Sequence, residues 1–289
     1  MKDTIDFKKQ SNFKEVWRRL KKDKLAMFGL VVFTLIVLMA ICAPLITPYE
    51  NVVKINAKER LLPMSAEHIF GTDVYGRDIF ARCVYGARMS LMISLICAVF
   101  SLIVGSLIGG LSSYLGGVFD TLVMRLFDII SAIPGLLLAM AVVAALGSSI
   151  TNLILAMAIT SVPETARVVR AAVLGIVDQE YIEACRLAGM STWRILTKHV
   201  LPNAIGVIIV KGTMSLSALI QAIATLSFLG LGINPPTPEW GALISEAKEF
   251  MLTSPTMILF PAAVLSITSF AVSVLGDGLR DALDPRLKN

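Results

Sequence analysis

Charged residues are scarce in this chain of 289 residues. They make up 16% of the sequence, whereas hydrophobic residues make up 56%. A water-soluble domain usually carries about a quarter charged residues, so the composition excludes an ordinary soluble protein. We therefore expect an integral membrane protein.

Residue types that usually carry chemistry are few as well. The chain has 2 histidines, His68 and His199, and 4 cysteines that form no C-x-x-C pair. This pattern predicts neither a metal site nor a disulfide framework. The chain also lacks the G-x-x-x-x-G-K-[ST] pattern of a phosphate-binding loop, so we expect no cofactor in this chain and no ATP hydrolysis by it alone.

The net charge of +5 does not indicate a nucleic-acid partner. Most basic residues flank apolar segments, and no stacking aromatic residues are interleaved with them. Lysines and arginines crowd the first 25 residues, and Arg280, Arg286 and Lys288 lie near the other end. Basic residues favour the cytoplasmic side of a membrane, so both termini are predicted to be cytoplasmic.

Six apolar segments approach the roughly 20 residues that a membrane-spanning helix needs. The expected fold class is therefore an all-α membrane protein with six transmembrane helices. Pro134 is expected to kink the third span, and Glu164 and Arg167 limit the apolar part of the fourth. The six spans are 26–46, 90–111, 118–146, 150–169, 204–231 and 256–275.

These spans divide the chain into five parts. Residues 1–25 are predicted to form an amphipathic segment on the cytoplasmic membrane surface, where Phe13, Val16, Trp17 and Leu20 share one helical face. Residues 26–46 form the first span, and residues 47–89 lie outside the cell. Residues 90–276 hold the other five helices, and residues 277–289 form a cytoplasmic tail.

A charged loop at 178–203 joins the fourth and fifth spans. Asp178 is a candidate N-cap for a first short helix, in which small side chains recur at helical spacing around Ala184 and Cys185. Gly189 suits the left-handed position that ends this helix, and Pro202 is expected to stop a second helix that Ser191 could cap. The face of small side chains would let another protein approach closely.

The spacing of this loop resembles the EAA loop of permease subunits of binding-protein-dependent ABC importers. That pattern is Glu-Ala-Ala, three residues, Gly, nine residues, then Ile-x-Leu-Pro. Cys185 stands in place of the second Ala and His199 in place of the Ile. Segments 71–78, 85–91, 228–241 and 275–286 are similar to the dipeptide, oligopeptide and nickel branch of the family, so the resemblance covers essentially the whole chain.

This resemblance implies a function and a set of partners. The chain would be a multi-pass permease of a prokaryotic cytoplasmic membrane that imports dipeptides or oligopeptides, with nickel or glutathione as alternative substrates. A second homologous permease would complete a heterodimer, two ATPase subunits would bind ATP and Mg, and an extracytoplasmic solute-binding protein would deliver the substrate. The coupling-helix loop that docks an ATPase would contain Glu183, Ala184, Cys185, Gly189, His199, Leu201 and Pro202.

Polar residues in the fifth span are candidates for the translocation pathway. Gln221 is the best of them, followed by Ser217 and Thr225, although such side chains also form hydrogen bonds between helices. Two other classes of protein remain open. An ion-coupled secondary transporter should show an embedded acid or inverted repeats, whereas a structural assembly subunit would not need the small-faced loop.

Overall fold

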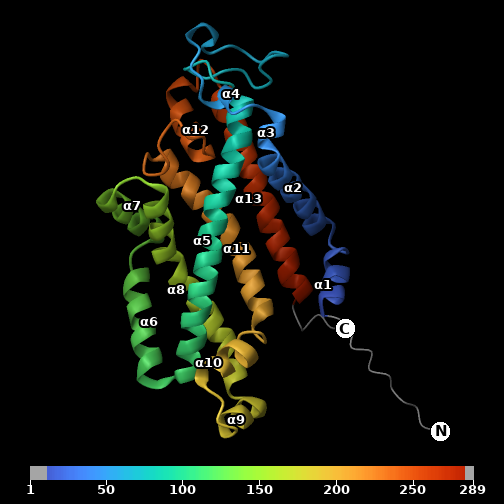
Figure 1. The fold of residues 1–289 in the computed structure, drawn as a ribbon, viewed down its shortest axis with the longest axis vertical. Helices are drawn as coiled ribbons and strands as arrows, with labels where there is room; N and C mark the ends of the chain where they lie inside the picture. The colour runs from blue at the N-terminus through green and yellow to red at the C-terminus, as the bar shows by residue number, and fades with distance from the viewer. Residues whose placement is uncertain (1–11, 284–289) are drawn as a thin grey trace, which may run out of the picture.

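A computed structural model describes residues 12–283, and its named elements are helical. The predicted orientation relies partly on basic residues before position 12 and after position 283, and these lie outside the described residues. The bundle is elongated, with residues 178–203, the predicted docking loop, at one end and residues 47–78 at the other (Figure 1). We call these the loop end and the far end. The helices are α1 (Asn12–Leu20), α2 (Lys24–Ile41), α3 (Ala43–Ile46), α4 (Glu50–Val53), α5 (Ile79–Leu115), α6 (Gly117–Ser131), α7 (Gly135–Leu146), α8 (Ile150–Val177), α9 (Glu180–Leu187), α10 (Thr192–Ile195), α11 (Ile205–Phe228), α12 (Trp240–Ala247) and α13 (Thr256–Leu283).

The longest helix, α5, runs from the far end to the loop end (Figure 1). It begins at Ile79 rather than at position 90 because the carboxylate of Asp78 accepts a hydrogen bond from the Ala81 amide, at 2.8 Å, and caps the helix. Close contact with α8 depends on small residues. A Cβ at Gly109 would lie 2.2 Å from the carbonyl oxygen of Ala166, so only glycine permits this approach.

The third predicted span is broken into two helices. α6 and α7 meet at 82°, and Pro134 immediately precedes α7. Proline has no backbone N–H and disfavours helical geometry at the residue before it, which explains the break. The kink predicted at Pro134 is confirmed, but it is sharp enough to separate 118–146 into two elements.

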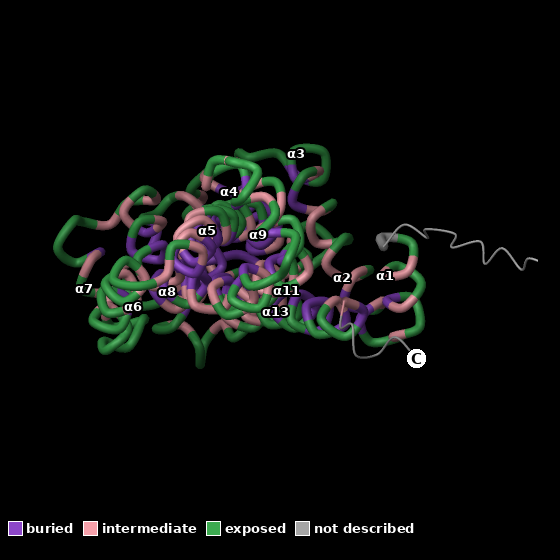
Figure 2. Tube along the Cα trace, turned by 90° about the horizontal axis from the view of Figure 1, so that it is seen from below, coloured by how far each residue is buried: buried purple, intermediate pink, exposed green. Residues whose placement is uncertain are grey.

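Among the described residues, α2, α5, α11 and α13 are long and apolar enough to cross a membrane, and α6 with α7 could form a fifth, bent span. α8 has 28 residues but carries Glu164, Arg167 and Arg170, so the count of six stays a prediction. Exposed residues surround the buried centre of the bundle (Figure 2). They include large apolar ones, among them Leu35 and Ile103, as a lipid-facing surface requires.

The amphipathic helix α1 is anchored on α13. Leu20 is buried in a cluster with Leu275 and Ala282, whereas Trp17 stays exposed; the side chain of Phe13 lies outside the described ones. α13 continues to Leu283, so the predicted cytoplasmic tail begins inside this helix.

A buried cluster of charges joins the elements of the far end. The Arg77 Nε atom lies 2.6 Å from an oxygen of Asp73, and the Arg82 Nη1 atom lies 2.8 Å from the same oxygen. Both arginines also contact Glu246 of α12, at 2.6 and 2.8 Å. The cluster therefore ties residues 73–77 and α12 to the start of α5.

Candidate docking loop and transport groove

The docking loop is fixed to the end of α8 by a small apolar core. Ile182 of α9 is fully buried and packs in one cluster with Val173 and Val177 of α8. Ile195 and Leu196, which follow α9 in the chain, belong to the same cluster. The short helix α9 is therefore held by tertiary packing, which it needs because isolated helices of this length are unstable in water.

The end of α9 is formed by Gly189, as predicted. Its φ angle is +73°, in the left-handed region that glycine adopts most easily. The Gly189 amide donates to the Arg186 carbonyl at 3.0 Å, and the Met190 amide donates to the Cys185 carbonyl at 3.2 Å. These two hydrogen bonds form a Schellman motif, which satisfies carbonyl groups left free at the helix end.

The predicted N-cap of α9 is wrong. Asp178 occupies the position that ends α8, and Gln179 is the residue before α9. The reason is that α8 continues to Val177, well past the end of the predicted span at 169, and its last residues Val173 and Val177 belong to the buried cluster that contains Ile182.

The second part of the loop is less regular than predicted. Ser191 does precede α10, but this helix has 4 residues and passes into a π-helical turn, Leu196–Val200, that contains His199. This turn ends before Pro202, as predicted. A side chain at Gly110 of α5 would meet Leu201 at 3.0 Å, so this end of the loop lies directly against α5.

The outward surface of the loop combines apolar and charged side chains. Glu183 and Ala184 are exposed, as are Leu187 at 83% and Trp193 at 60%. We call these four exposed residues the docking face, after the role predicted for the loop. Exposed apolar groups clustered beside polar ones are typical of protein contact sites. Among the other predicted residues, Gly189 and Pro202 are exposed, whereas Cys185, His199 and Leu201 are partly buried.

Two further contacts brace the loop and were not found from the sequence. The Arg186 Nε atom donates to the Tyr114 hydroxyl of α5 at 3.3 Å, and the side-chain amide of Asn203 donates to the Tyr181 hydroxyl at 2.9 Å. The partners are 72 and 22 positions apart. No local pattern connects residues at such separations, so the sequence alone gives no signal for them.

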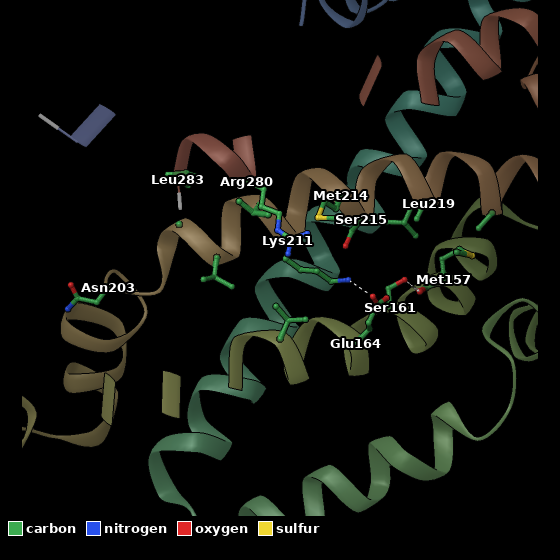
Figure 3. A pocket seen from close by; sticks show the side chains of 16 residues that line it. Met157, Ser161, Glu164, Asn203, Lys211, Met214, Ser215, Leu219, Arg280 and Leu283 are labelled. Carbon is green, nitrogen blue, oxygen red and sulfur yellow. Dashed lines mark hydrogen bonds and ion pairs between the residues drawn. The ribbon is translucent and has the colours of Figure 1, made fainter. Parts of the chain in front are cut away.

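A groove of about 890 Å³ lies between α8 and α11 (Figure 3). Its lining is mostly apolar, with Met157 on α8 and Met214 on α11, but it also contains an ion pair and the cationic side chain of Arg280 from α13. The Lys211 Nζ atom lies 2.6 Å from an oxygen of Glu164. No sequence pattern pointed to Lys211.

A second groove, of about 710 Å³, lies between α11 and α13. Gln221 and Thr225 line it, and their place in a translocation pathway stays a prediction. Ser217 is buried instead, and its hydroxyl donates to the Ser269 carbonyl of α13 at 2.8 Å. Its hydroxyl is therefore engaged in a contact between helices.

The two grooves share one face of α11. Their lining residues on this helix recur mainly at intervals of three and four, which places them on one side of an α-helix. The face therefore extends along most of α11, from the end nearest the docking loop toward the far end. The residues with this spacing are Val207, Val210, Lys211, Met214 and Ala218 in the first groove and Gln221, Thr225 and Phe228 in the second; Gly206, Ser215, Leu219, Ala222 and Ala224 of α11 also line the grooves.

A membrane-embedded helical bundle with a braced docking loop and a grooved helix face has the features of a transport permease. Residues 101–289 match the family described as binding-protein-dependent transport system inner membrane component. Residues 11–63 match the N-terminal transmembrane domain of oligopeptide transport permease C. The chain belongs to this family of multi-pass ABC importer permeases, which confirms the resemblance found in the sequence.

Its relatives include two kinds of named permease. The dipeptide transport system permease protein DppC of Alkalihalophilus pseudofirmus is 43% identical over 96% of this chain and 91% of its own. The DppC protein of Bacillus subtilis is 40% identical over 99% and 89%. The glutathione transport system permease protein GsiD of Escherichia coli is 43% identical over 95% and 90%.

The fold has a solved counterpart. A chain of the MetNI methionine ABC transporter in an inward-facing conformation aligns with a TM-score of 0.58 and 20% identity. The alignment covers 71% of this chain and 98% of that one. This likeness supports the fold alone.

Proposed function

We propose that this chain is a permease subunit of an ATP-driven importer that moves dipeptides or oligopeptides across a prokaryotic cytoplasmic membrane. The observation that carries the proposal is the docking face of α9 and α10, which is exposed while the loop beneath it is packed against α8 and α5. A force applied to such a loop moves the attached helices rather than bending the loop. The peptide substrate follows from the names of the DppC relatives.

The partners follow from the family. Two ATPase subunits bind ATP and Mg, and one of them contacts the docking loop, so this loop lies in the cytoplasm. With an even number of spans and basic flanks, both termini lie on the same side. A second permease, homologous but not identical, completes the transmembrane dimer, and a solute-binding protein delivers the peptide on the outer side. This chain needs no cofactor and hydrolyses no ATP.

The loop joins the two helices that form the first groove. α8 leads into it and α11 leaves it. ATP binding to the partners favours one of two conformations, and displacement of α9 changes how α8 and α11 sit relative to each other.

The predicted site residues have different roles in this proposal. Glu183 and Ala184 contact the ATPase directly. The residues that maintain the conformation of the loop are Cys185, Gly189, His199, Leu201 and Pro202. Gln221 and Thr225 line the pathway, and Ser217 supports it through its contact with α13.

The test is reconstitution of the complete complex in lipid vesicles. Uptake of a radiolabelled dipeptide should require Mg-ATP and the binding protein, and the purified chain alone should show no ATPase activity. Uptake driven by an ion gradient without ATP would instead favour the secondary transporter. If substitutions in the docking face leave uptake unchanged, the ATPase is coupled to the chain at another site.

Glutathione is the second candidate substrate, because the GsiD relative is as similar as the first DppC relative. Competition separates the two candidates. If the importer carries dipeptides, an excess of unlabelled glutathione should leave the uptake of labelled dipeptide unchanged. Nickel ions should leave it unchanged as well.

A further inference from the structure

We propose that the groove between α8 and α11 is a binding site for the charged ends of a peptide. Lys211 would bind the peptide α-carboxylate, and Glu164 would bind the peptide α-ammonium group. This inference rests on the proposed function, since it assigns a peptide site within the same permease.

The burial of the two charged residues differs strongly. The side chain of Lys211 is 12% exposed, whereas that of Glu164 is 70% exposed. A largely buried ammonium group needs an anionic partner, because an unpaired charge is costly away from water. Glu164 supplies that partner here, and Figure 3 shows the pair within the groove. Its exposed carboxylate has room to move aside when another anion arrives.

A peptide with free ends matches this pair in charge. Its α-carboxylate can replace Glu164 beside Lys211, and its α-ammonium can then pair with the displaced Glu164. Each charge keeps an opposite partner throughout this exchange. A ligand with one charge can make only one of these two pairings, so the site favours zwitterions over singly charged ligands.

The size and lining of the groove also suit a peptide. Its volume of about 890 Å³ falls within the roughly 300–1,000 Å³ of typical small-ligand sites, and an extended dipeptide spans about 7 Å. Met157 and Met214 contribute flexible thioether side chains to the lining. Such side chains adapt to partners of different shape, so the site would accept varied peptide side chains.

The position of the pair links binding to transport. Glu164 lies on the helix that enters the docking loop, and Lys211 lies on the helix that leaves it. A peptide that separates Glu164 from Lys211 removes an ion pair between these two helices. Occupation of the groove would therefore change how firmly the helices are held together.

Photo-crosslinking of the complete complex without the binding protein tests this inference. The probe is a tritiated dipeptide with free ends and a diazirine side chain, and mass spectrometry locates the label. In the wild type, label should appear on α8 and α11. An unlabelled free dipeptide should compete about tenfold better than its C-terminal amide or its N-acetyl derivative, as expected for the loss of a hydrogen bond to a charged group.

Three variants sharpen the result. Lys211→Met should remove the advantage of the free carboxylate over the amide, and Glu164→Gln should remove the advantage of the free amine over the N-acetyl form. Asp120→Asn is the matched control, since it breaks the ion pair between Arg170 and Asp120. Neither of these two residues lines the groove. It should preserve both advantages.

Equal competition by all three ligands in the wild type would overturn the inference, even if the variants failed to assemble. So would label confined to other helices. ATP-driven dipeptide uptake with the binding protein is measured on the same preparation. If uptake is present while the groove shows no preference, the inference is wrong and the proposed function stands. If the wild-type complex transports no dipeptide, the proposed function itself is wrong.

Discussion

The guanidinium carbon of Arg186 lies 4.7 Å from the centre of the Tyr114 ring, and its Nε atom donates to the Tyr114 hydroxyl. Arg186 belongs to the docking helix α9, and Tyr114 is next to the last residue of α5. The other end of α5 is held by the contacts of Arg82 with Asp73 and Glu246. A single helix thus connects the docking loop to the charged cluster at the far end.

Removing the Tyr114 ring should weaken coupling between ATP hydrolysis and transport. A cation–π contact at an exposed site contributes about 0.5–1 kcal/mol, which corresponds to a roughly two- to fivefold effect. We expect Tyr114→Ala to lower dipeptide uptake per ATP hydrolysed by about that factor. Tyr114→Phe keeps the ring and should retain most of the coupling. An unchanged ratio in Tyr114→Ala would show that this contact does not transmit motion.

Substitution of Gly189 should disturb the docking loop through the backbone alone. A Cβ at this position would meet nothing within 4 Å, so the penalty comes from the φ angle of +73°. A β-branched residue there costs about 1–2 kcal/mol or more. Gly189→Val should therefore reduce uptake, coupling and co-purification of the ATPase while the helices still insert.

Gly189→Asn is the matched control for this substitution, because asparagine tolerates left-handed geometry better than other residues with a Cβ. It should lie between the wild type and Gly189→Val in all three measurements. If both variants behave as the wild type, the shape of this turn does not matter for docking.

These residues show how far sequence patterns reach in this protein. The left-handed turn at Gly189 is a local property of one residue after a helical pattern, and it was predicted correctly. The N-cap at Asp178 was wrong because α8 extends through Val173 and Val177 into the buried cluster that contains Ile182, and a local window does not show that packing.

Long-range pairs had no signal at all. Lys211 and Glu164 lie in different helices, and their contact depends on how α8 and α11 pack. The short helix α12 was also missed. Its residues Trp240 and Leu243 are buried against other elements, so packing rather than an amphipathic pattern explains why this segment is helical.

The charged cluster at the far end should make stability depend on pH. Burial raises the pKa of Glu246, but hydrogen bonds and charge attraction from Arg82 and Arg77 outweigh it, so the pKa lies below its usual value. A carboxylate with a lowered pKa stabilises the folded state above its unfolded pKa, and this stabilisation is lost as the pH falls through its folded pKa.

Thermal unfolding of the purified complex measures this effect. At pH 7 the wild type should melt at a higher temperature than Glu246→Gln, and the difference should shrink below about pH 4.3, the ordinary pKa of glutamate. Glu249→Gln, at an exposed neighbouring position, should show little difference at either pH. A difference that stays constant or grows on acidification would contradict the assignment of the charged cluster.

The orientation of the chain can be tested at the two ends of α13. Leu252 precedes this helix and is 92% exposed, and Asp281 lies in its last turn and is also exposed. The native thiols are poor reporters, since Cys83 is buried and Cys185 lies in the docking loop where a partner would cover it. Single cysteines should therefore be placed at Leu252 and Asp281 in a chain without its native cysteines.

With both termini cytoplasmic, Leu252→Cys should react with a membrane-impermeant maleimide in intact cells. Asp281→Cys should react only after the membrane is permeabilised, because the 28-residue helix α13 is long enough to carry the chain across a hydrocarbon core of about 30 Å. The reverse pattern would invert the topology and place the docking loop outside, where no ATPase could reach it. Labelling of both positions in intact cells would mean that α13 does not cross the membrane.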